Sequence, residues 1–346
     1  MEAPAISVER AIEWKDEICS LVAGRNGYGV GDAAGGFSLV CRDGVVAWRT
    51  ESQGAAVAVC PVSDLKGNEF WVVGYDLKDV PKPESHWRIY DGEGKELCGE
   101  TSNFGRITTI FPFRCNESGE KGFIIGTTGW MALAYDLTGK RLWTFKCYHN
   151  MICGAAADCN QDGADEILLG AGYYYHQMLN AKGKMLFQRN CDAWNYDVAV
   201  TDINGDGIPE FICGREDDAV HVMTPLDTKP EPDIKPLKLG GVPIKLASCA
   251  NGFAVAVENG AVVRVGTGMS LLWSTELPSG LAGLAEADDH FYTVCRDGYL
   301  YRLDGTGKVT GKLPFATNSA SYYRPIVVAG SLGLAASSGH RLIMLK

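Results

Sequence analysis

The sequence lacks long apolar runs, an excess of basic residues and closely spaced cysteine pairs. No stretch approaches the roughly 18 apolar residues of a membrane-spanning helix, so we expect no membrane span. The formal net charge of −10 disfavours a nucleic-acid partner, because phosphate binding requires a basic surface. Residues 1–6 have neither the basic start nor the apolar stretch of a signal peptide.

The 12 cysteines include no CxxC motif and no adjacent pair. Most lie in apolar, strand-like stretches, so we expect them to be reduced and to pack as small hydrophobic side chains. Pairing across strands remains open, whereas a zinc site would need ligands at shorter spacing. A Gly-x-Ser-x-Gly elbow and a Walker loop are also missing, which disfavours the enzyme classes that depend on them.

Two copies of one nine-residue motif stand out: DCNQDGADE at 158–166 and DINGDGIPE at 202–210. Each copy has oxygen-bearing side chains at positions 1, 3, 5 and 9, and glycine at position 6. A tight loop needs this alternation to surround a hard cation. Apolar stretches flank both copies, which predicts strand, loop, strand. The sequence thus predicts up to two Ca²⁺ sites, with the ligands Asp158, Asn160, Asp162, Glu166, Asp202, Asn204, Asp206 and Glu210.

A second repeated element is a turn that resembles Gly-Lys-x-Leu-Trp. It occurs at 44–48, 94–97, 139–143, 183–187, 268–273 and 307–310. These turns and the two motifs recur with a period of about 43 residues, and short strands separated by glycine turns fill each period. Such a repeat indicates an all-β propeller.

We predict one domain, residues 1–346, forming an eight-bladed β-propeller, with seven blades as the alternative because the first period is poorly marked. In that period, 19–23 is expected to be the second strand and 37–41 the third. The last period has three strands, so residues 3–8 should supply its fourth and close the ring. The predicted blades are 9–50, 55–105, 106–148, 150–192, 195–238, 242–278, 280–318, and 322–346 with 3–8.

The nine-residue motifs resemble the calcium loops of FG-GAP-type propeller repeats, and the turns resemble the repeats of quinoprotein-type, PQQ-like propellers. The resemblance covers nearly the whole chain. It extends to rhamnogalacturonan lyases with an eight-bladed, calcium-binding propeller, and next to ulvan lyases. It implies a carbohydrate-active protein, but no active-site motif of these families aligns. Quinoproteins are expected to be longer and to carry a vicinal disulfide, so we expect no PQQ.

Propeller geometry sorts the loops of strands A to D onto two faces. The cation motifs are A–B loops and the Gly-Lys turns are C–D turns, so both lie opposite the D–A and B–C loops. We therefore expect Ca²⁺ to be structural, because an acidic A–B loop would repel itself without a cation.

The D–A and B–C loops are rich in aromatic, arginine and amide groups, which suit an acidic oligosaccharide or polysaccharide. Aromatic rings stack on sugars, and arginine pairs with carboxylates. Many of these rings could instead pack between blades. The substrate-binding candidates are Arg106, Trp130, Asn150, Tyr173, His176, Trp194, Asn195, Arg215, Tyr323 and Arg324.

Two functions remain open. The first is a polysaccharide lyase that cleaves a uronate-containing glycan by β-elimination, which needs a base, an acid and a carboxylate clamp. The second is a non-catalytic propeller that binds glycan or protein, as one domain of a longer secreted protein. The Ca²⁺ motifs favour an extracellular or periplasmic location. For the lyase, the base would be His149, the acid Tyr148 or Tyr196, and the clamp Arg106, Arg215 or Arg324.

Overall fold

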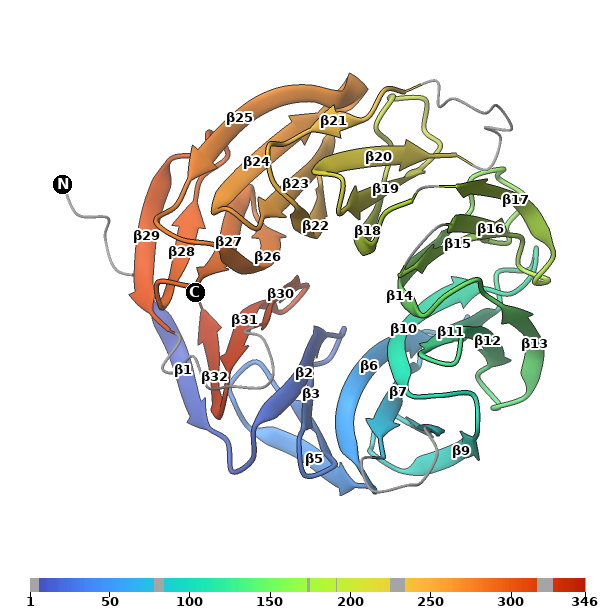
Figure 1. Ribbon diagram of the computed structural model, residues 1–346. Helices are drawn as coiled ribbons and strands as arrows, with labels where there is room; N and C mark the ends of the chain where they lie inside the picture. Colours follow the sequence, from blue (N-terminus) through green and yellow to red (C-terminus); the bar gives the residue numbers. More distant parts are fainter. Residues whose placement is uncertain are drawn as a thin grey trace.

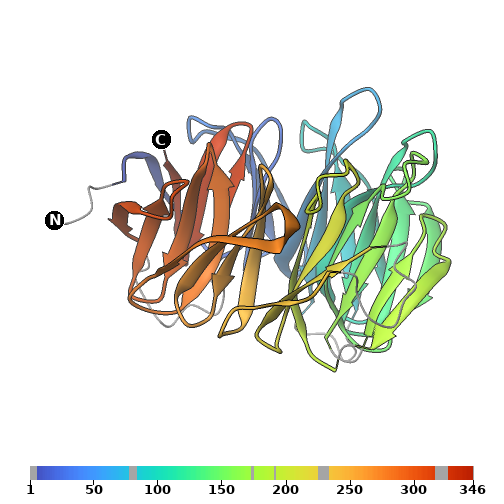
Figure 2. The ribbon, with the colours of Figure 1, turned by 90° about the horizontal axis from the view of Figure 1, so that it is seen from above.

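The chain folds into a closed ring of eight four-stranded antiparallel sheets, an eight-bladed β-propeller (Figures 1 and 2). The computed structural model describes residues 6–77, 84–172, 175–190, 192–224, 234–315 and 326–345. Within these ranges every element is a strand except one 3₁₀ turn, η1 (Thr267–Met269). None of the described segments forms a helix that could cross a membrane. The predicted fold class and the predicted number of blades are confirmed.

In blades 1 to 4 the chain runs from the innermost strand to the rim. Blade 1 consists of β2 (Ile18–Ala23), β3 (Tyr28–Asp32), β4 (Gly36–Val40) and β5 (Val46–Glu51). Blade 2 consists of β6 (Ala55–Ser63), β7 (Glu69–Asp76), β8 (Ser85–Tyr90) and β9 (Glu96–Ser102). Blade 3 consists of β10 (Ile107–Arg114), β11 (Lys121–Thr127), β12 (Met131–Asp136) and β13 (Arg141–Lys146). Blade 4 consists of β14 (Met151–Ala157), β15 (Glu166–Ala171), β16 (Tyr175–Leu179) and β17 (Met185–Asn190).

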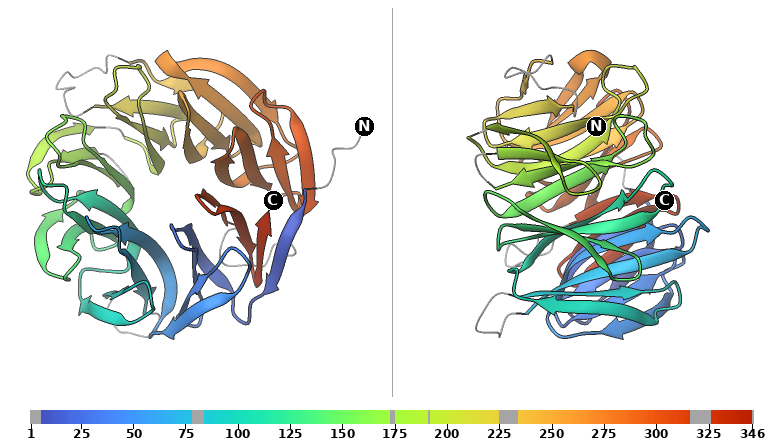
Figure 3. Two further views of the ribbon diagram at one scale, coloured as in Figure 1. Left: turned by 180° about the vertical axis from the view of Figure 1, so that it is seen from behind. Right: turned by 90° about the vertical axis from the view of Figure 1, so that its right-hand side faces the viewer.

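Blades 5 to 7 repeat this order, and blade 8 closes the ring (Figure 3). Blade 5 consists of β18 (Asn195–Thr201), β19 (Glu210–Arg215), β20 (Ala219–Met223) and β21 (Leu237–Lys238). Blade 6 consists of β22 (Pro243–Cys249), β23 (Gly252–Val257), β24 (Ala261–Gly266) and β25 (Ser270–Glu276). Blade 7 consists of β26 (Leu281–Ala287), β27 (His290–Cys295), β28 (Tyr299–Leu303) and β29 (Val309–Pro314). Blade 8 consists of β30 (Ile326–Gly330), β31 (Gly333–Ser338), β32 (Arg341–Leu345) and β1 (Val8–Glu13).

The N-terminal strand β1 closes the ring by pairing antiparallel with β32. The strand is predicted at residues 3–8, whereas in the structure it begins at Val8; residues 3–5 lie outside the described ranges. Because β1 is an outermost strand, most of its side chains are exposed, so its sequence is polar and hard to recognise. Trp14 follows it and donates its indole N–H to Asp32 of blade 1 (3.1 Å), which ties the closing strand to the first blade.

Blade 1 differs from the prediction by one strand. Residues 19–23 lie in the innermost strand, and the second strand is the glycine-rich β3. A Cβ atom on Gly29 would lie 2.5 Å from the indole of Trp71, so glycine here permits the close approach of blade 2 rather than forming a turn. The loop at residues 24–27 therefore joins the first and second strands, on the face opposite to the predicted one.

Tryptophans of the Gly-Lys-x-Leu-Trp turns join neighbouring blades. Each donates its indole N–H to a carbonyl in the outer turn of the next blade, at 2.8–2.9 Å. A glycine with positive φ in that turn packs against the indole, where a Cβ would come within 2.7 Å. The repeated motif is thus an inter-blade contact. The pairs are Trp48 with Gly94, Trp143 with Gly183, and Trp273 with Gly307.

The cysteines follow the predicted pattern. None of the eleven in the described ranges forms a disulfide bond, and seven of them are buried. They contribute to the packing between blades: Cys60, for example, lies in an apolar cluster with Val72 and Trp87.

Candidate functional site

Loops of two kinds meet on one face of the ring, which we call the entry face: those that join consecutive blades and those between second and third strands. Backbone hydrogen bonds link the two kinds, as from Cys147 N to Trp130 O (2.7 Å) and from Gly172 N to Asn150 O (2.7 Å). The opposite face, the turn face, carries the remaining loops, including both cation motifs. The two faces can therefore be considered separately.

Three ring side chains form a row on the entry face, across blades 3 to 5. The imidazole of His149 stacks on Trp130, with centroids 5.6 Å apart and planes inclined by 24°. Its other neighbour, Trp194, meets it edge-on at 5.7 Å. Gly172 leaves room for this contact, because a Cβ there would lie 3.0 Å from the Trp194 ring and 3.1 Å from His149 Nδ1. We call Trp130, His149 and Trp194 the aromatic row.

The exposed aromatic side chains of the described chain are all on this face. They are Trp130 (43% exposed) in blade 3, Tyr148 (54%) in the loop between blades 3 and 4, and Tyr196 (39%) at the start of β18 in blade 5. The ring of Tyr148 packs against Tyr175 with centroids 4.7 Å apart. The structure thus places the predicted residues His149, Tyr148, Trp130 and Trp194 in one neighbourhood.

Tyr196 occupies a β-bulge at the start of the innermost strand β18, between Asn195 and Asp197. The innermost strands of blades 1 to 7 all have a bulge here, and bulges can redirect a side chain. Blade 5 alone among these seven places an aromatic residue at the bulge. The equivalent residues are Cys19, Val57, Thr108, Ile152, Ile244 and Ala282.

Three other candidates lie beneath this surface, between blades 4 and 5. His176 and Asn195 are fully buried and hydrogen-bonded to each other. Burial, opposed by the bond to Asn195, lowers the pKa of His176 to about 3, so its imidazole is neutral at ordinary pH. This geometry gives His176 and Asn195 a role in joining two blades.

Arg215 is 7% exposed and belongs to a charged network with His221 and Asp217. His221 Nε2 lies 3.0 Å from Asp217 Oδ2, and Arg215 Nη1 lies 3.2 Å from His221 Nδ1. Burial and, next, Arg215 lower the pKa of His221 to about 4. Burial alone would raise the pKa of Asp217, but Arg215 and His221 lower it overall. Arg215 is thus bound into the fold rather than presented to solvent.

The remaining predicted residues are spread over the entry face or lie outside the described ranges. Arg106 is about half exposed, and its Nε lies 3.3 Å from Asp76 Oδ1. Asn150 uses its carbonyl to accept the Gly172 N–H. Tyr173, Tyr323 and Arg324 are outside the described ranges.

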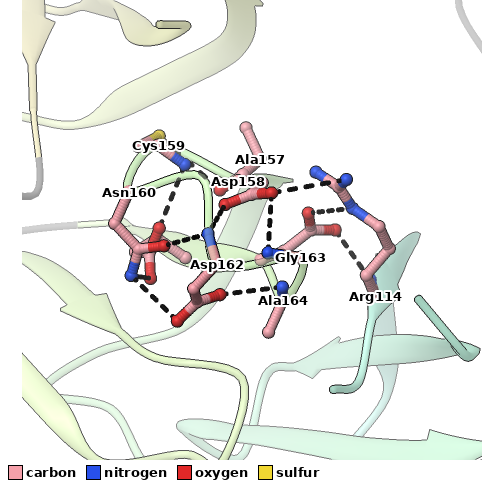
Figure 4. Close-up of polar contacts among 10 residues, drawn as sticks. Arg114, Ala157, Asp158, Cys159, Asn160, Asp162, Gly163 and Ala164 are labelled. Atoms are coloured by element: carbon pink, nitrogen blue, oxygen red, sulfur yellow. Dashed lines mark hydrogen bonds and ion pairs between the residues drawn. The ribbon is translucent and has the colours of Figure 1, made fainter. Parts of the chain in front are cut away.

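The two cation motifs form closely similar loops on the turn face, each between the first two strands of its blade. In the first, Asp158 accepts hydrogen bonds from the backbone of Asp162 and Gly163, both at 3.0 Å (Figure 4). The amide of Asn160 donates to Glu166 (2.9 Å) and Asp162 (3.2 Å). The second loop repeats these contacts with Asp202, Asn204, Asp206 and Glu210.

Each loop carries three carboxylates and an amide, and such oxygen donors suit Ca²⁺. Burial and repulsion from Asp162 and Asp158 raise the pKa of Glu166, which is the electrostatic cost that a cation would relieve. However, in the described part of the chain no group of three or more His, Cys, Asp or Glu side chains is arranged to hold a metal ion. In the first loop the amide nitrogen of Asn160 bridges two carboxylates. The Ca²⁺ sites stay a prediction.

The first loop is also fixed to blade 3 by an arginine that the sequence analysis missed. Arg114 Nε lies 2.7 Å from Asp165 Oδ1, and Arg114 Nη1 lies 3.6 Å from Asp158 (Figure 4). In the second loop Pro209 replaces Asp165, and the neighbouring Ile208 packs in an apolar cluster with Ala157. The sequence signal for this contact is the extra carboxylate, Asp165, at position 8 of the first motif.

Two cavities of about 750 and 670 Å³ lie on the turn face, beside the first loop. They share Cys115, Asn116, Ala181 and Lys182, so they form one trough across the rim of blades 2 to 4. Asn160, Asp162 and Glu166 line one end, and exposed leucines such as Leu65 and Leu142 line the other. Side chains of loops from several periods meet in this trough. The trough was not predicted, because the sequence pattern of a single period does not show which loops of different periods lie together.

Comparison with known proteins supports the fold and leaves the family open. No family model matches the chain, and no curated protein matches it. Among solved structures it is similar to BamB from Moraxella catarrhalis (13% identity, TM-score 0.73, 99% of this chain and 98% of that one). Saccharomyces cerevisiae Sqt1 is also similar (13%, 0.72, 99% of both chains). So is the C-terminal WD40 domain of Sif2 (8%, 0.75, 100% of both). Identities this low show a shared fold alone. The FG-GAP and PQQ-like repeat types and the lyase resemblance remain predictions.

Proposed function

We propose that this chain is a carbohydrate-binding β-propeller without catalytic activity, and that its binding surface is the entry face of blades 3 to 5. The observation that carries this proposal is that the exposed aromatic side chains of the described chain, Trp130, Tyr148 and Tyr196, gather there. Exposed tryptophan and tyrosine combine an apolar ring face with a polar edge. Sugar rings, with apolar C–H faces and hydroxyl rims, are their chemical complement.

The lyase hypothesis has less support from the described residues. β-Elimination requires a cationic group that neutralises the substrate carboxylate. Arg106 is paired with Asp76, and Arg215 is buried with Asp217 and His221. His149 stands between two tryptophans, where its ring serves as part of a surface. The ring contacts therefore favour a binding protein over a lyase. They also favour glycans in general as ligands, with no particular preference for acidic ones.

Two further proposals accompany this function. Ca²⁺ in one or both acidic loops would act as a structural ion, because the loops lie on the turn face, away from the aromatic residues. Loops of this kind suit an environment with abundant calcium, so we propose an extracellular or periplasmic location, where other domains of a longer chain are expected partners.

The test is a binding screen by isothermal titration calorimetry against oligogalacturonides, xylo-oligosaccharides and cello-oligosaccharides. We expect binding to at least one series, and loss of binding in the double variant Tyr148→Ala, Tyr196→Ala. Leu65→Ala, which removes an exposed apolar side chain on the turn face, is the matched control and should bind normally. An ultraviolet-absorbing unsaturated product would restore the lyase hypothesis. Failure to bind any glycan would refute the proposed function.

A further inference from the structure

Trp130 has a backbone conformation that repeats around the ring but a side chain that does not. Its φ is +65°, in the left-handed region. Trp130 lies in the turn between the second and third strands of its blade. In five blades the carbonyl of the residue at this position accepts a hydrogen bond from the backbone N–H of the residue just after the outermost strand, with N···O distances of 2.7–3.0 Å. The equivalent residues, with their φ angles, are Gly35 (+92°), Asp218 (+59°), Gly260 (+110°) and Gly298 (+91°).

Glycine, and to a lesser degree aspartate, tolerates positive φ, whereas a bulky side chain there is an outlier that costs free energy. Packing within the fold accounts for the tryptophan only in part, because it stacks on His149 while 43% of the residue stays exposed. A strained residue that the fold does not require points to a function. Blade 3 thus departs from the repeat in order to place an indole at the surface.

The neighbours of Trp130 define a direction on this surface. The aromatic row continues from Trp130 through His149 to Trp194, with successive centroids 5.6 and 5.7 Å apart. These residues come from the turn between β11 and β12, the loop between β13 and β14, and the loop between β17 and β18. Blades 3, 4 and 5 are consecutive around the ring (Figure 1), so the row follows the circumference instead of descending the central channel.

We infer that the ligand is a linear oligosaccharide that lies along the aromatic row, across blades 3 to 5, with Trp130 as the stacking residue that fixes one end. This inference rests on the proposed carbohydrate-binding function and specifies its ligand as a chain of several sugars. Of the row itself only Trp130 is exposed, but Tyr148 and Tyr196, which lie beside His149 and Trp194 in the sequence, are exposed as well. Successive sugars can therefore each contact a separate ring, whereas one sugar can use only one. Affinity should therefore depend on chain length.

The experiment measures the dissociation constant against chain length, from monosaccharide to hexasaccharide, for the series that binds in the screen. In the wild type, affinity should rise with length and then level off. Trp130→Gly keeps the favoured backbone and removes one ring, so it should weaken binding of the longer chains by about threefold to tenfold. Leu65→Ala, on the turn face, is the control and should bind like the wild type.

The outcomes distinguish this inference from the proposed function. If no sugar of any length binds, the proposed function itself fails. If glycans bind but affinity is the same for one sugar as for six, the ligand does not lie along the row. If chain length matters but Trp130→Gly binds normally and Tyr196→Ala does not, the chain enters at the channel mouth and the inference is refuted. Circular dichroism and the thermal midpoint establish that each variant is folded.

Discussion

Substitution of Trp130 by glycine and by alanine measures the strain at this position. A left-handed conformation costs a residue with a Cβ atom about 1–2 kcal/mol, and φ is +65° here. Glycine avoids this cost but raises the entropy of the unfolded chain, which is worth about 0.4–1 kcal/mol in favour of alanine. The difference leaves Trp130→Gly more stable than Trp130→Ala by about 1 kcal/mol.

Both variants lose the same ring, so the lost contact with His149 cancels when the two are compared with each other. Each should be assayed by urea denaturation with far-ultraviolet circular dichroism, because the substitution removes a fluorophore. Thr144 is the matched control: it is exposed in β13 and does not have a positive φ. At Thr144 the order should reverse, with alanine more stable than glycine by about 0.5–1 kcal/mol.

If Trp130→Ala is as stable as Trp130→Gly, the backbone at this position is not strained and the prediction is wrong. It is also refuted if the two substitutions at Thr144 give the same order as at Trp130, because glycine would then be favoured for some reason other than φ. A strained and exposed Trp130 is the premise of the inference about ligand binding, so this comparison tests that premise without any ligand.

Two further predictions concern acid and calcium. Burial lowers the pKa values of His86 and His221 to about 4 and that of His176 to about 3. Between pH 6.5 and 4 the unfolded chain therefore binds more protons than the folded chain. As the pH is lowered through this range, the free energy of unfolding should decrease by up to about 1.4 kcal/mol per pH unit for each buried histidine. His86→Gln should flatten the pH dependence of the urea midpoint, and an unchanged slope would contradict this assignment. Calcium should raise the thermal midpoint and chelation lower it, and Asp206→Ala should remove more of this shift than Asp162→Ala, because Arg114 already fixes the first loop to blade 3. Equal losses would show that Arg114 does not substitute for the ion, and no response to calcium would rule out the sites.

The repeat predicted the fold because each period has to pack against its two neighbours in the same way. The spacing of the Gly-Lys turns predicted the blades, since three of these turns receive the tryptophan of the preceding blade, as Gly183 receives Trp143. The sequence reading failed where a local signal had a non-local cause. Gly29 resembles a turn residue, but it is a glycine because Trp71 of the next blade occupies the space of a side chain.

The candidate site was predicted only in part for the same reason. Topology placed His149 and Trp194 on one face, and the structure brings them into contact. Burial could not be read from residue type, so Arg215 and His176 were expected at the surface although they lie between sheets. Arg114 was missed because its partner Asp165 is 51 residues away in the next blade.

A repeated fold offers its own control for function, because the other blades show what packing requires at each position. Gly29 departs from an ordinary strand residue, and Trp71 accounts for it. Trp130 departs from the glycine or aspartate of four other blades, and Tyr196 departs from the small or aliphatic bulge residues of six. Both side chains are exposed. Both departures fall on the same face and in neighbouring blades. Two independent exceptions to the repeat, both exposed on the same face, are better explained by one bound ligand than by two separate structural causes.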